Sequence, residues 1–277
     1  MISIITAIYN QLNMNILFYE SLIKYTKNDF ELIIIDNGST DGSREYFEQQ
    51  KYVKMIKNAG NYSYPHCQNQ GIRVAKYDYL VFLNNDLIVS KNWDEKTIKI
   101  MNMHKLEVAS NCATDRMETQ EITYKYHKRW KYIKNPLLFL FGTPKWNLKL
   151  MFKLMYGNWD KWNEKRYAQF ETAVKEGISG SCVWIKRSAL DKIGLWDESM
   201  QGADFDIFLR TKKCSVETGL VEPANIILGV YIHHYIRLTT KKTHSVFIDG
   251  ENLIPLIQKW DINEAGKLVK DTDLQVD

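Results

Sequence analysis

The sequence predicts an α/β fold with a mostly parallel central sheet flanked by helices. Short apolar runs rich in β-forming residues alternate with helical patterns in the first part of the chain, and these runs cover 2–8, 32–35, 52–57 and 79–83. Strands that alternate with helices form parallel sheets with right-handed crossovers. Three of the runs end abruptly in polar side chains, at Tyr9, Asp36 and Asn84. The carboxyl ends of such strands form the ligand-binding edge of an open α/β sheet, so we expect one site there.

Helical patterns connect the predicted strands. Apolar residues recur at helical spacing from Met14 to Tyr25, behind Asn13, which can cap the helix. A second helix begins at 41–42 and a third covers 64–76. Regular patterning resumes at Gly177. From there we predict a strand at 181–185, a helix at about 204–213, strands at 215–221 and 226–233, and a closing amphipathic helix near 248–260.

Length and composition indicate a soluble globular protein. The chain has 277 residues, of which 45% are hydrophobic, enough for one large or two small domains. It begins directly with a strand, and its longest uncharged apolar run, 136–141, is too short to cross a bilayer. Four isolated cysteines without Cys-x-x-Cys spacing favour free thiols in a reducing cytoplasm: Cys67, Cys112, Cys182 and Cys214. The absence of Gly-x-Gly-x-x-Gly and P-loop patterns argues against the standard dinucleotide and P-loop folds.

The segment 124–170 is locally basic, although the net charge of the whole chain is only +4. Its basic residues are Lys125, Lys128, Arg129, Lys131, Lys134, Lys145, Lys149, Lys153, Lys161, Lys165 and Arg166, interleaved with Trp130, Phe139, Phe141, Trp146, Phe152, Trp159 and Trp162. Such a segment could contact an anionic membrane, recruit a phosphorylated or glycan acceptor, or bind nucleic acid. Alternatively, it is a helical insertion whose aromatic residues pack on the sheet while its lysines face water.

Asp86 is the candidate metal ligand, because it follows a buried strand at the expected ligand edge. Carboxylate oxygens are the ligands that hard divalent cations prefer. The alternative is that Asp86 caps the next turn. His233 and His234 end another apolar strand, and either could supply a further ligand or be a core group.

Asp36 follows four aliphatic residues and precedes a Gly-Ser-Thr-Asp-Gly turn. Its carboxylate could accept hydrogen bonds from a ribose or a pyrimidine N–H, or it could form an Asx turn. Asp41 is better explained as a helix cap than as a ligand contact.

Six motifs, in order along the chain, resemble the family 2 glycosyltransferases with the GT-A fold. They are Ile4-Ile-Thr-Ala-Ile-Tyr-Asn10, Asp36-Asn-Gly-Ser-Thr-Asp-Gly42, Asn58-Ala-Gly-Asn61 with Asn69-Gln-Gly71, Leu83-Asn-Asn-Asp86, Gly180-Ser-Cys-Val-Trp-Ile-Lys-Arg187 and Ile193-Gly-Leu-Trp-Asp-Glu198. The resemblance covers roughly 1–112 and 177–260 and leaves the basic segment outside. It implies transfer of a sugar from a UDP or dTDP donor to an acceptor hydroxyl, with inversion and with Mn²⁺ or Mg²⁺.

The resemblance also implies roles for individual residues. Asn84-Asn-Asp86 takes the place of the family's Asp-x-Asp, and Ala203-Asp-Phe-Asp206 takes the place of its Glu-Asp-x-Asp. The implied donor-binding residues are Thr6, Ala7, Tyr9, Asp36, Asn58, Asn69, Asn84 and Asn85. Gly180 and Asp206 are implied on the acceptor side.

Asp204 is the candidate catalytic base. An acceptor hydroxyl must lose a proton as it attacks the anomeric carbon, so a carboxylate is required on the face opposite the leaving group. Asp206 lies two residues further along the predicted helix and therefore points to a different side, which leaves it to orient the loop or cap the helix. Ala203 stands where the family usually has Glu, which removes one polar contact on the acceptor side.

Together these features predict three regions: a nucleotide-sugar-binding half at 1–114, a basic helical insertion at 115–176 and an acceptor-side half at 177–277. We expect a role in cell-surface glycan or polysaccharide synthesis, with a glycan, lipid-linked or other hydroxyl acceptor. The protein is expected in the cytoplasm, where 124–170 could contact the inner membrane face. A catalytically silent sugar-nucleotide or glycan-binding module is the alternative, and a nucleic-acid or membrane adaptor would rest on 124–170 alone. No nucleic acid partner is expected.

Overall fold

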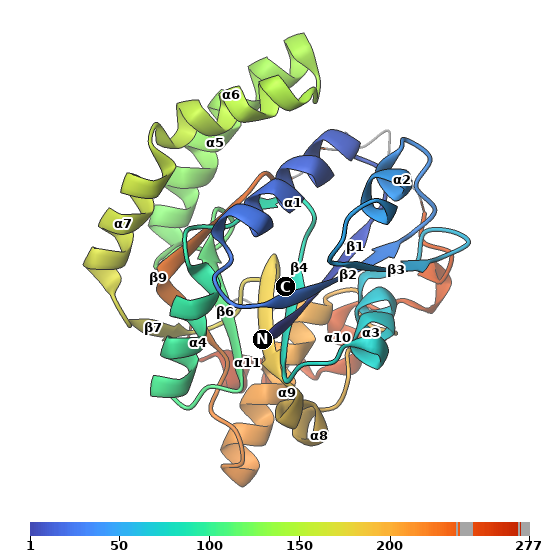
Figure 1. Cartoon of the computed structure of the whole chain (residues 1–277). Coiled ribbons are helices and arrows are strands. Elements are labelled where there is room, and N and C mark those ends of the chain that lie inside the picture. The colour runs from blue at the N-terminus through green and yellow to red at the C-terminus, as the bar shows by residue number, and fades with distance from the viewer. Residues whose placement is uncertain (237, 239–245, 271, 273–277) are drawn as a thin grey trace.

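The computed structural model describes residues 1–236, 238, 246–270 and 272. A central sheet runs through the molecule with helices on both of its faces, and the helical segment 120–156 extends beyond one end of the sheet (Figure 1). Buried aliphatic and aromatic side chains form one core on each face of the sheet. No helix in the described ranges combines the length and hydropathy needed to cross a membrane.

The first half of the sheet is parallel, as predicted. It contains β1 (Ile2–Ile8), β2 (Phe30–Asp36), β3 (Val53–Lys57) and β4 (Tyr79–Leu83). The connecting helices are α1 (Leu12–Tyr25), α2 (Ser43–Glu48) and α3 (Tyr64–Val74). In this register Asp36 lies opposite Ile8, so the carboxyl ends of β1 and β2 are level at one sheet edge.

The second half of the sheet is mixed, so the expectation of a mostly parallel sheet holds only for the first half. Its elements are β5 (Leu87–Ile88), α4 (Trp93–Met103), β6 (Val108–Ala113), β7 (Val174–Glu176), β8 (Cys182–Lys186) and β9 (Asn225–His234). Strand β8 lies between β4 and β6 and runs antiparallel to both, while β6 and β9 are parallel. The strand order is β3-β2-β1-β4-β8-β6-β9-β5, with β7 paired to β9.

Two predictions for the last third of the chain are wrong. The strand predicted at 215–221 does not form, because α9 (Ala203–Thr218) continues to Thr218 and ends at Gly219, whose φ of 65° is left-handed. In place of a single closing helix at 248–260 the chain forms a 3₁₀ turn (Gly250–Asn252), α10 (Leu256–Lys259) and α11 (Ile262–Val269). Pro255 lies directly before α10, where its missing N–H and fixed φ prevent an uninterrupted helix. The short α8 (Arg187–Ile193) precedes α9.

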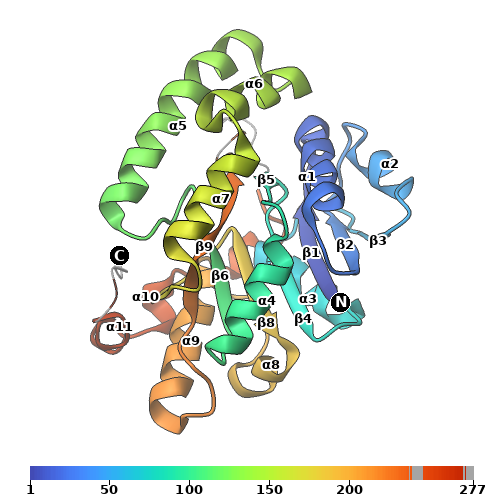
Figure 2. The same ribbon diagram turned by 60° about the vertical axis from the view of Figure 1, so that its left-hand side comes forward.

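The basic segment is helical, as predicted, and consists of α5 (Gln120–Phe141), α6 (Lys145–Tyr156) and α7 (Trp159–Phe170). Helices α5 and α6 extend beyond the sheet in both views (Figures 1 and 2). The inner aromatic residues pack on the sheet domain. Trp130 is 2% exposed and its indole N–H donates to the carbonyl of Tyr235, and Trp159 donates to the carbonyl of Val89. Packing on the sheet domain therefore accounts for the aromatic residues on the inner face of this segment.

Candidate active site

Polar side chains from three strand ends meet at the expected edge of the sheet. Asp86 follows β4, Asp115 follows β6, and His234 ends β9. Nε2 of His234 lies 3.1 Å from Oδ1 of Asp86, and Nδ1 of His234 lies 3.0 Å from Oδ1 of Asp115. Strand β5 begins directly after Asp86 and pairs antiparallel with β9, with Leu87 opposite His234, which brings the imidazole to Asp86.

The two carboxylates set the charge of this cluster. Burial disfavours the imidazolium form, but Asp86 and Asp115 outweigh burial and raise the pKa of His234 to about 10. Burial alone would raise the pKa of Asp115, yet the neighbouring His234 and the Ser181 hydroxyl hold that pKa below its ordinary value of 3.8. In the structure described, His234 therefore donates hydrogen bonds to a carboxylate on each side.

Asp204 approaches the same cluster from the start of α9. It is the second residue of α9, beside Gly180 in the loop before β8. Ser181, the next residue in that loop, donates to Asp115 at 3.2 Å. Burial raises the pKa of Asp204, and the negative charge of Asp115 raises it further. The loop therefore contacts Asp204 through Gly180 and Asp115 through Ser181, and Asp115 in turn contacts His234, the partner of Asp86.

Gly180 is required by the position of Asp204. A Cβ built on Gly180 would lie 2.0 Å from Oδ2 and 2.7 Å from Cγ of Asp204, far inside van der Waals contact. We therefore expect Gly180→Ala to displace the carboxylate and lower the turnover rate by about 10²-fold, because a shift of about 1 Å at a reacting group can cost that much. The rate should be measured with donor affinity and thermal stability.

The matched control for this substitution is Gly202→Ala. A Cβ on Gly202 meets nothing within 4 Å, although Gly202 directly precedes α9. This variant should turn over at close to the wild-type rate. Equal rates in the two alanine variants would contradict the placement of Asp204 against Gly180.

The predicted donor wall lies along the ends of β1 and β2. Asp36 is fully buried, and its carboxylate accepts hydrogen bonds from the backbone N–H of Ser39 and from Nε of Arg44. The Ser39 contact is the Asx-type turn considered as an alternative role for Asp36. The hydroxyl of Thr6 is buried without a hydrogen-bond partner among the described residues. Ala7 and Tyr9 are half-buried beside it.

Two other buried polar groups on α3 also have unmet hydrogen-bonding capacity. The Tyr64 hydroxyl and the Gln68 amide lie one turn apart, and neither has a partner within the described part of the chain. The charge of Asp204 acts on Tyr64, which places this end of α3 close to the acceptor side of the site. Buried polar atoms of this kind normally bind water or a ligand. Neither residue belongs to a motif or strand end that would identify it from the sequence.

The four asparagines expected at the donor site divide into two pairs. Asn84 and Asn85 lie beside Asp86 and are half-buried; the Asn85 amide donates to Asn15 of α1. Asn58 and Asn69 are buried and hydrogen-bonded within the protein. Asn58 bonds with Asn37 and Gln70, and Asn69 bonds with Trp196 and Glu198.

These bonds give Asn58 and Asn69 a clear structural role, since they tie the loops around α3 to each other and to the segment before α9. The structure does not bring their amides to the Asp86 cluster.

His233 and His234 lie on opposite faces of β9, because successive side chains of a strand alternate. The ring of His233 is fully buried, 4.6 Å from that of Trp130, and its Nδ1 bonds with the Tyr156 hydroxyl at 2.8 Å. Burial lowers the pKa of His233 well below its ordinary value, so this imidazole is neutral. Of the two histidines, the structure brings only His234 to Asp86.

Asp206 is also placed away from the reacting groups. It is fully buried and accepts hydrogen bonds from Arg210 and from the indole of Trp260, and Lys259 lies 2.7 Å away. These contacts hold the C-terminal segment against α9, so Asp206 orients the fold around the site.

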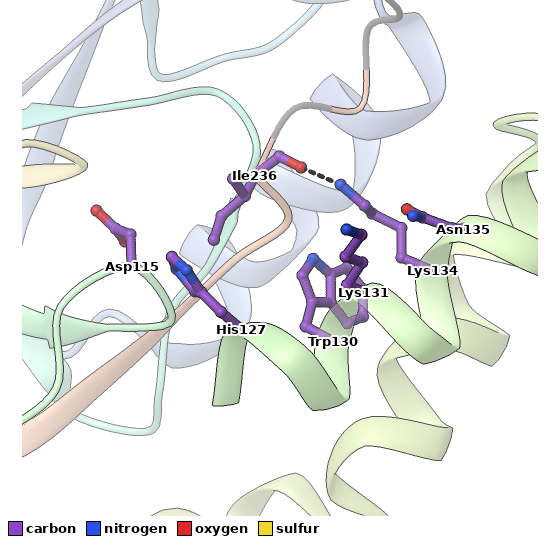
Figure 3. A pocket seen from close by; sticks show the side chains of 7 residues that line it. All are labelled: Asp115, His127, Trp130, Lys131, Lys134, Asn135 and Ile236. Atoms are coloured by element: carbon purple, nitrogen blue, oxygen red, sulfur yellow. Dashed lines mark hydrogen bonds between the residues drawn. The ribbon is translucent and has the colours of Figure 1, made fainter. Parts of the chain in front are cut away.

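A hollow of about 640 Å³ opens beside Asp115. It is lined by Asp115, Ile236 and one face of α5, which contributes His127, Trp130, Lys131, Lys134 and Asn135 (Figure 3). We call this space the α5 hollow. The Lys134 ammonium donates to the carbonyl of Ile236 (Figure 3), and Lys131 is exposed.

Asp115 is the main residue missing from the sequence prediction. It follows the strand 108–113 as Asp86 follows 79–83, so the same signal of a carboxylate after a buried strand could have identified it. The described residues contain no group of three His, Cys, Asp or Glu side chains arranged to hold a metal ion. One carboxylate and one imidazole do converge, and divalent cations bound with substrate phosphates often use only one or two protein ligands. The donor set therefore fits a cation that is bound together with a diphosphate.

Comparisons with known proteins agree with this architecture. The model of a protein family described as Glycosyl transferase family 2 matches residues 3–194. Glycosyltransferase GlyG of Streptococcus pneumoniae is 31% identical over 99 residues, which are 34% of this chain and 33% of that protein. The poly(ribitol-phosphate) beta-glucosyltransferase of Bacillus spizizenii is 31% identical over 94 residues, 31% of this chain and 14% of that protein. The chain thus matches no more than about a third of either relative's length.

Solved structures share the fold at low sequence identity. The mannosyltransferase PcManGT from Pyrobaculum calidifontis, in complex with GDP-Man and Mn²⁺, superposes with a TM-score of 0.56 and 14% identity, covering 87% of this chain and 58% of that chain. S. aureus TarS 1-349 in complex with UDP gives a TM-score of 0.56 at 13% identity, covering 99% of this chain and 67% of that chain. These likenesses establish the GT-A type fold predicted from the sequence.

Proposed function

Because the chain belongs to glycosyl transferase family 2, we propose that it transfers a sugar from a UDP or dTDP donor to an acceptor hydroxyl with inversion. One observation supports this proposal most strongly. A single cluster of contacts connects Asp86, the candidate ligand of a diphosphate-bound cation, with Asp204, the candidate base. Asp86 contacts His234, His234 contacts Asp115, and Asp115 is bonded through Ser181 to the loop against which Asp204 lies. Donor and acceptor chemistry both need these groups within one site.

Asp86 would hold Mn²⁺ or Mg²⁺ together with His234, whose Nε2 would have to give up its proton when the cation arrives, because only a neutral imidazole nitrogen coordinates a metal. When bound, the cation would neutralise the charge that develops on the diphosphate as the glycosidic bond breaks. The protein contributes the position of both ligands, because the pairing of β5 with β9 fixes His234 next to Asp86. Asn84 adds a neutral amide where a second carboxylate would otherwise lie, so the site is expected to bind the cation more tightly with donor than without it.

Asp204 would accept the proton of the acceptor hydroxyl as its oxygen attacks the anomeric carbon. The bond between the anomeric carbon and the diphosphate breaks on the opposite face, and the nucleoside diphosphate leaves with the bonding electrons. Burial raises the pKa of Asp204, which makes this carboxylate a stronger base than an exposed aspartate. Its position at the start of α9 leaves it half-buried, so that a substrate can reach it.

The α5 hollow is the proposed path for the acceptor, since Asp115 lines it and also contacts His234. Lys131 and Lys134 favour an acceptor that carries an anionic group such as a phosphate. We expect Lys131→Glu to lower the preference for glycerol phosphate over glycerol, as simple acceptors, by about tenfold, since a charged hydrogen bond contributes roughly 1.5 kcal/mol or more. The rates of transfer to both compounds measure this preference.

Lys165→Glu on α7 is the matched control, because Lys165 is exposed and does not line the hollow. Donor hydrolysis should be unchanged in both variants. An identical preference in Lys131→Glu and wild type would move the acceptor path elsewhere.

The names of similar proteins suggest the biological setting. One relative is a poly(ribitol-phosphate) glucosyltransferase, and the structural neighbours were solved with UDP or with GDP-Man and Mn²⁺. These names support synthesis of a cell-surface glycan. The acceptor in this proposal is a glycan, lipid-linked or other hydroxyl compound, and transfer takes place on the cytoplasmic side of the membrane.

The test of the proposed function is the release of nucleoside diphosphate from a panel of nucleotide sugars with Mn²⁺ or Mg²⁺. Slow release in water and faster release with an acceptor is the expected pattern. A protein that binds one nucleotide sugar but releases no diphosphate under any condition would instead be the non-catalytic binding module.

A further inference from the structure

The outer end of the α5–α6 hairpin carries large apolar side chains in water. On α5 the ring of Phe139 is 89% exposed and Leu140 is 65% exposed; on α6 Trp146 is 54% exposed and Leu154 is 52% exposed. Phe141 and Leu150 are exposed as well. We call these six residues the hairpin tip. Exposed apolar groups gathered in this way are uncommon on a soluble monomer and mark an interaction surface.

Packing within the chain does not account for the hairpin tip. Phe141 and Trp146 contact each other across the turn, with ring centroids 5.2 Å apart, but both remain exposed. The buried aromatic residues of the same helices, such as Trp130 and Tyr156, lie on the inner faces toward β9. Figures 1 and 2 both show the ends of α5 and α6 that face each other lying farthest from the sheet.

The charge around the hairpin tip has one sign. From Ile122 to Trp159 the sequence contains eight basic residues and no Asp or Glu; the basic residues are Lys125, Lys128, Arg129, Lys131, Lys134, Lys145, Lys149 and Lys153. The whole chain, by contrast, is nearly balanced, with 37 basic and 33 acidic residues. Ion pairs with acidic side chains are formed by Lys125 with Glu121 on α5, and by Lys145 and Lys149 with Glu20 of α1. The local excess of positive charge favours an anionic partner over a neutral one.

We propose that the hairpin tip docks on an anionic lipid bilayer. Exposed aromatic and aliphatic side chains on helices that also carry many basic residues are the pattern of interfacial helices, whose apolar residues enter the headgroup region while the basic residues remain among the anionic headgroups. The α5 hollow lies on the same helix as Phe139 and Leu140, so docking brings the hollow to the membrane surface. The surface does not involve Asp86 or Asp204, so this inference is independent of the donor chemistry.

Sedimentation with lipid vesicles tests the proposal. The intact protein should bind vesicles containing 30 mol% phosphatidylglycerol. Its affinity for vesicles of phosphatidylcholine alone should be lower by about tenfold or more. Binding should weaken from 0.1 M to 1 M salt, since the Debye length falls from about 10 Å to about 3 Å. The variant Phe139→Ser/Leu140→Ser/Trp146→Ser should lose about tenfold or more of its affinity for the anionic vesicles.

The matched control is Val216→Ser/Leu220→Ser, two exposed apolar residues at the far end of α9 and just beyond it. All changed side chains are exposed, so the melting temperatures and the release of nucleoside diphosphate in solution should stay near wild type. Lys149→Gln/Lys153→Gln should weaken binding to anionic vesicles without creating binding to neutral ones.

Two outcomes would overturn the proposal. One is equal vesicle binding by the wild type and the hairpin-tip variant, both folded by melting temperature. The other is a concentration-dependent dimer in analytical ultracentrifugation that the hairpin-tip variant abolishes, with no vesicle binding by the wild type. The second result would assign the hairpin tip to a second copy of this chain.

Discussion

Asp204→Asn should lower the rate of sugar transfer by about 10²–10⁴-fold while leaving donor affinity unchanged. Asparagine keeps the size of the side chain but cannot accept the acceptor proton. The loss corresponds to ~3–5 kcal/mol of activation free energy. Transfer rate and the dissociation constant of the donor, both measured on the same protein, separate the chemical step from binding.

Asp191→Asn is the matched control, because Asp191 is exposed on α8. Asp206→Asn is not a neutral control. It would remove charged contacts with Arg210 and Lys259 in a buried position and so lower stability. If Asp204→Asn stays within a few-fold of the wild-type rate, the base lies elsewhere in the site.

The raised pKa of Asp204 predicts how the transfer rate falls at acidic pH. Burial, followed by the charge of Asp115, raises its pKa above the ordinary 3.8. A base must be ionised, so transfer should fall as pH decreases through a midpoint above 3.8, and this limb should be absent from the residual activity of Asp204→Asn.

A carboxyl with a raised pKa in the folded state destabilises the fold, and this cost develops as pH rises from the unfolded pKa through the folded pKa. At neutral pH, Asp204→Asn should therefore melt at the wild-type temperature or higher.

Asp86→Asn should abolish metal-dependent donor binding and reduce turnover by roughly 10²-fold or more, since charge stabilisation by a bound cation amounts to about 3 kcal/mol or more. Excess chelator should have the same effect on the wild type. Donor binding with and without Mn²⁺, measured by calorimetry, gives a readout that does not depend on activity.

Asp191→Asn serves again as the control and should retain the metal dependence. Full turnover of the wild type in excess chelator would show that transfer does not depend on a divalent cation. It would leave Asp86 as a hydrogen-bond partner of His234.

The sequence allowed the parallel half of the sheet to be predicted because each strand there is a run of aliphatic residues bounded by turn residues. Strand β8 was also found, but not its direction, because a buried strand has the same sequence pattern in a parallel or an antiparallel pair. The strand predicted at 215–221 contains few strongly helical signals, yet α9 continues through Thr218. Residues 216–218 are exposed, so burial does not cause this extension; the last turn is closed by the hydrogen bond from the Gly219 N–H to the Ser215 carbonyl.

At the site, most of the predictable residues were polar side chains that directly follow a predicted strand. The position after a buried strand singled out Asp86, and the resemblance of 203–206 to the family's Glu-Asp-x-Asp motif singled out Asp204. The choice between His233 and His234 needed the register of β9 against β5. The hydrogen bonds of Asn58 and Asn69 were not predicted, because their partners, such as Gln70 and Trp196, are distant in the sequence. Hydrogen bonds of this kind cannot be read from local spacing.

The most direct test of the central claim is a thermal-shift titration of the intact protein with nucleotide sugars, with and without Mn²⁺. A ligand that binds only the folded state stabilises it by about 2.7 kcal/mol at 100 times its dissociation constant. The predicted result is that a UDP- or dTDP-sugar raises the melting temperature in the presence of Mn²⁺, and that Asp86→Asn removes this shift while Asp204→Asn retains it. No shift with any nucleotide sugar at millimolar concentration, with or without metal, would contradict the assignment of this site.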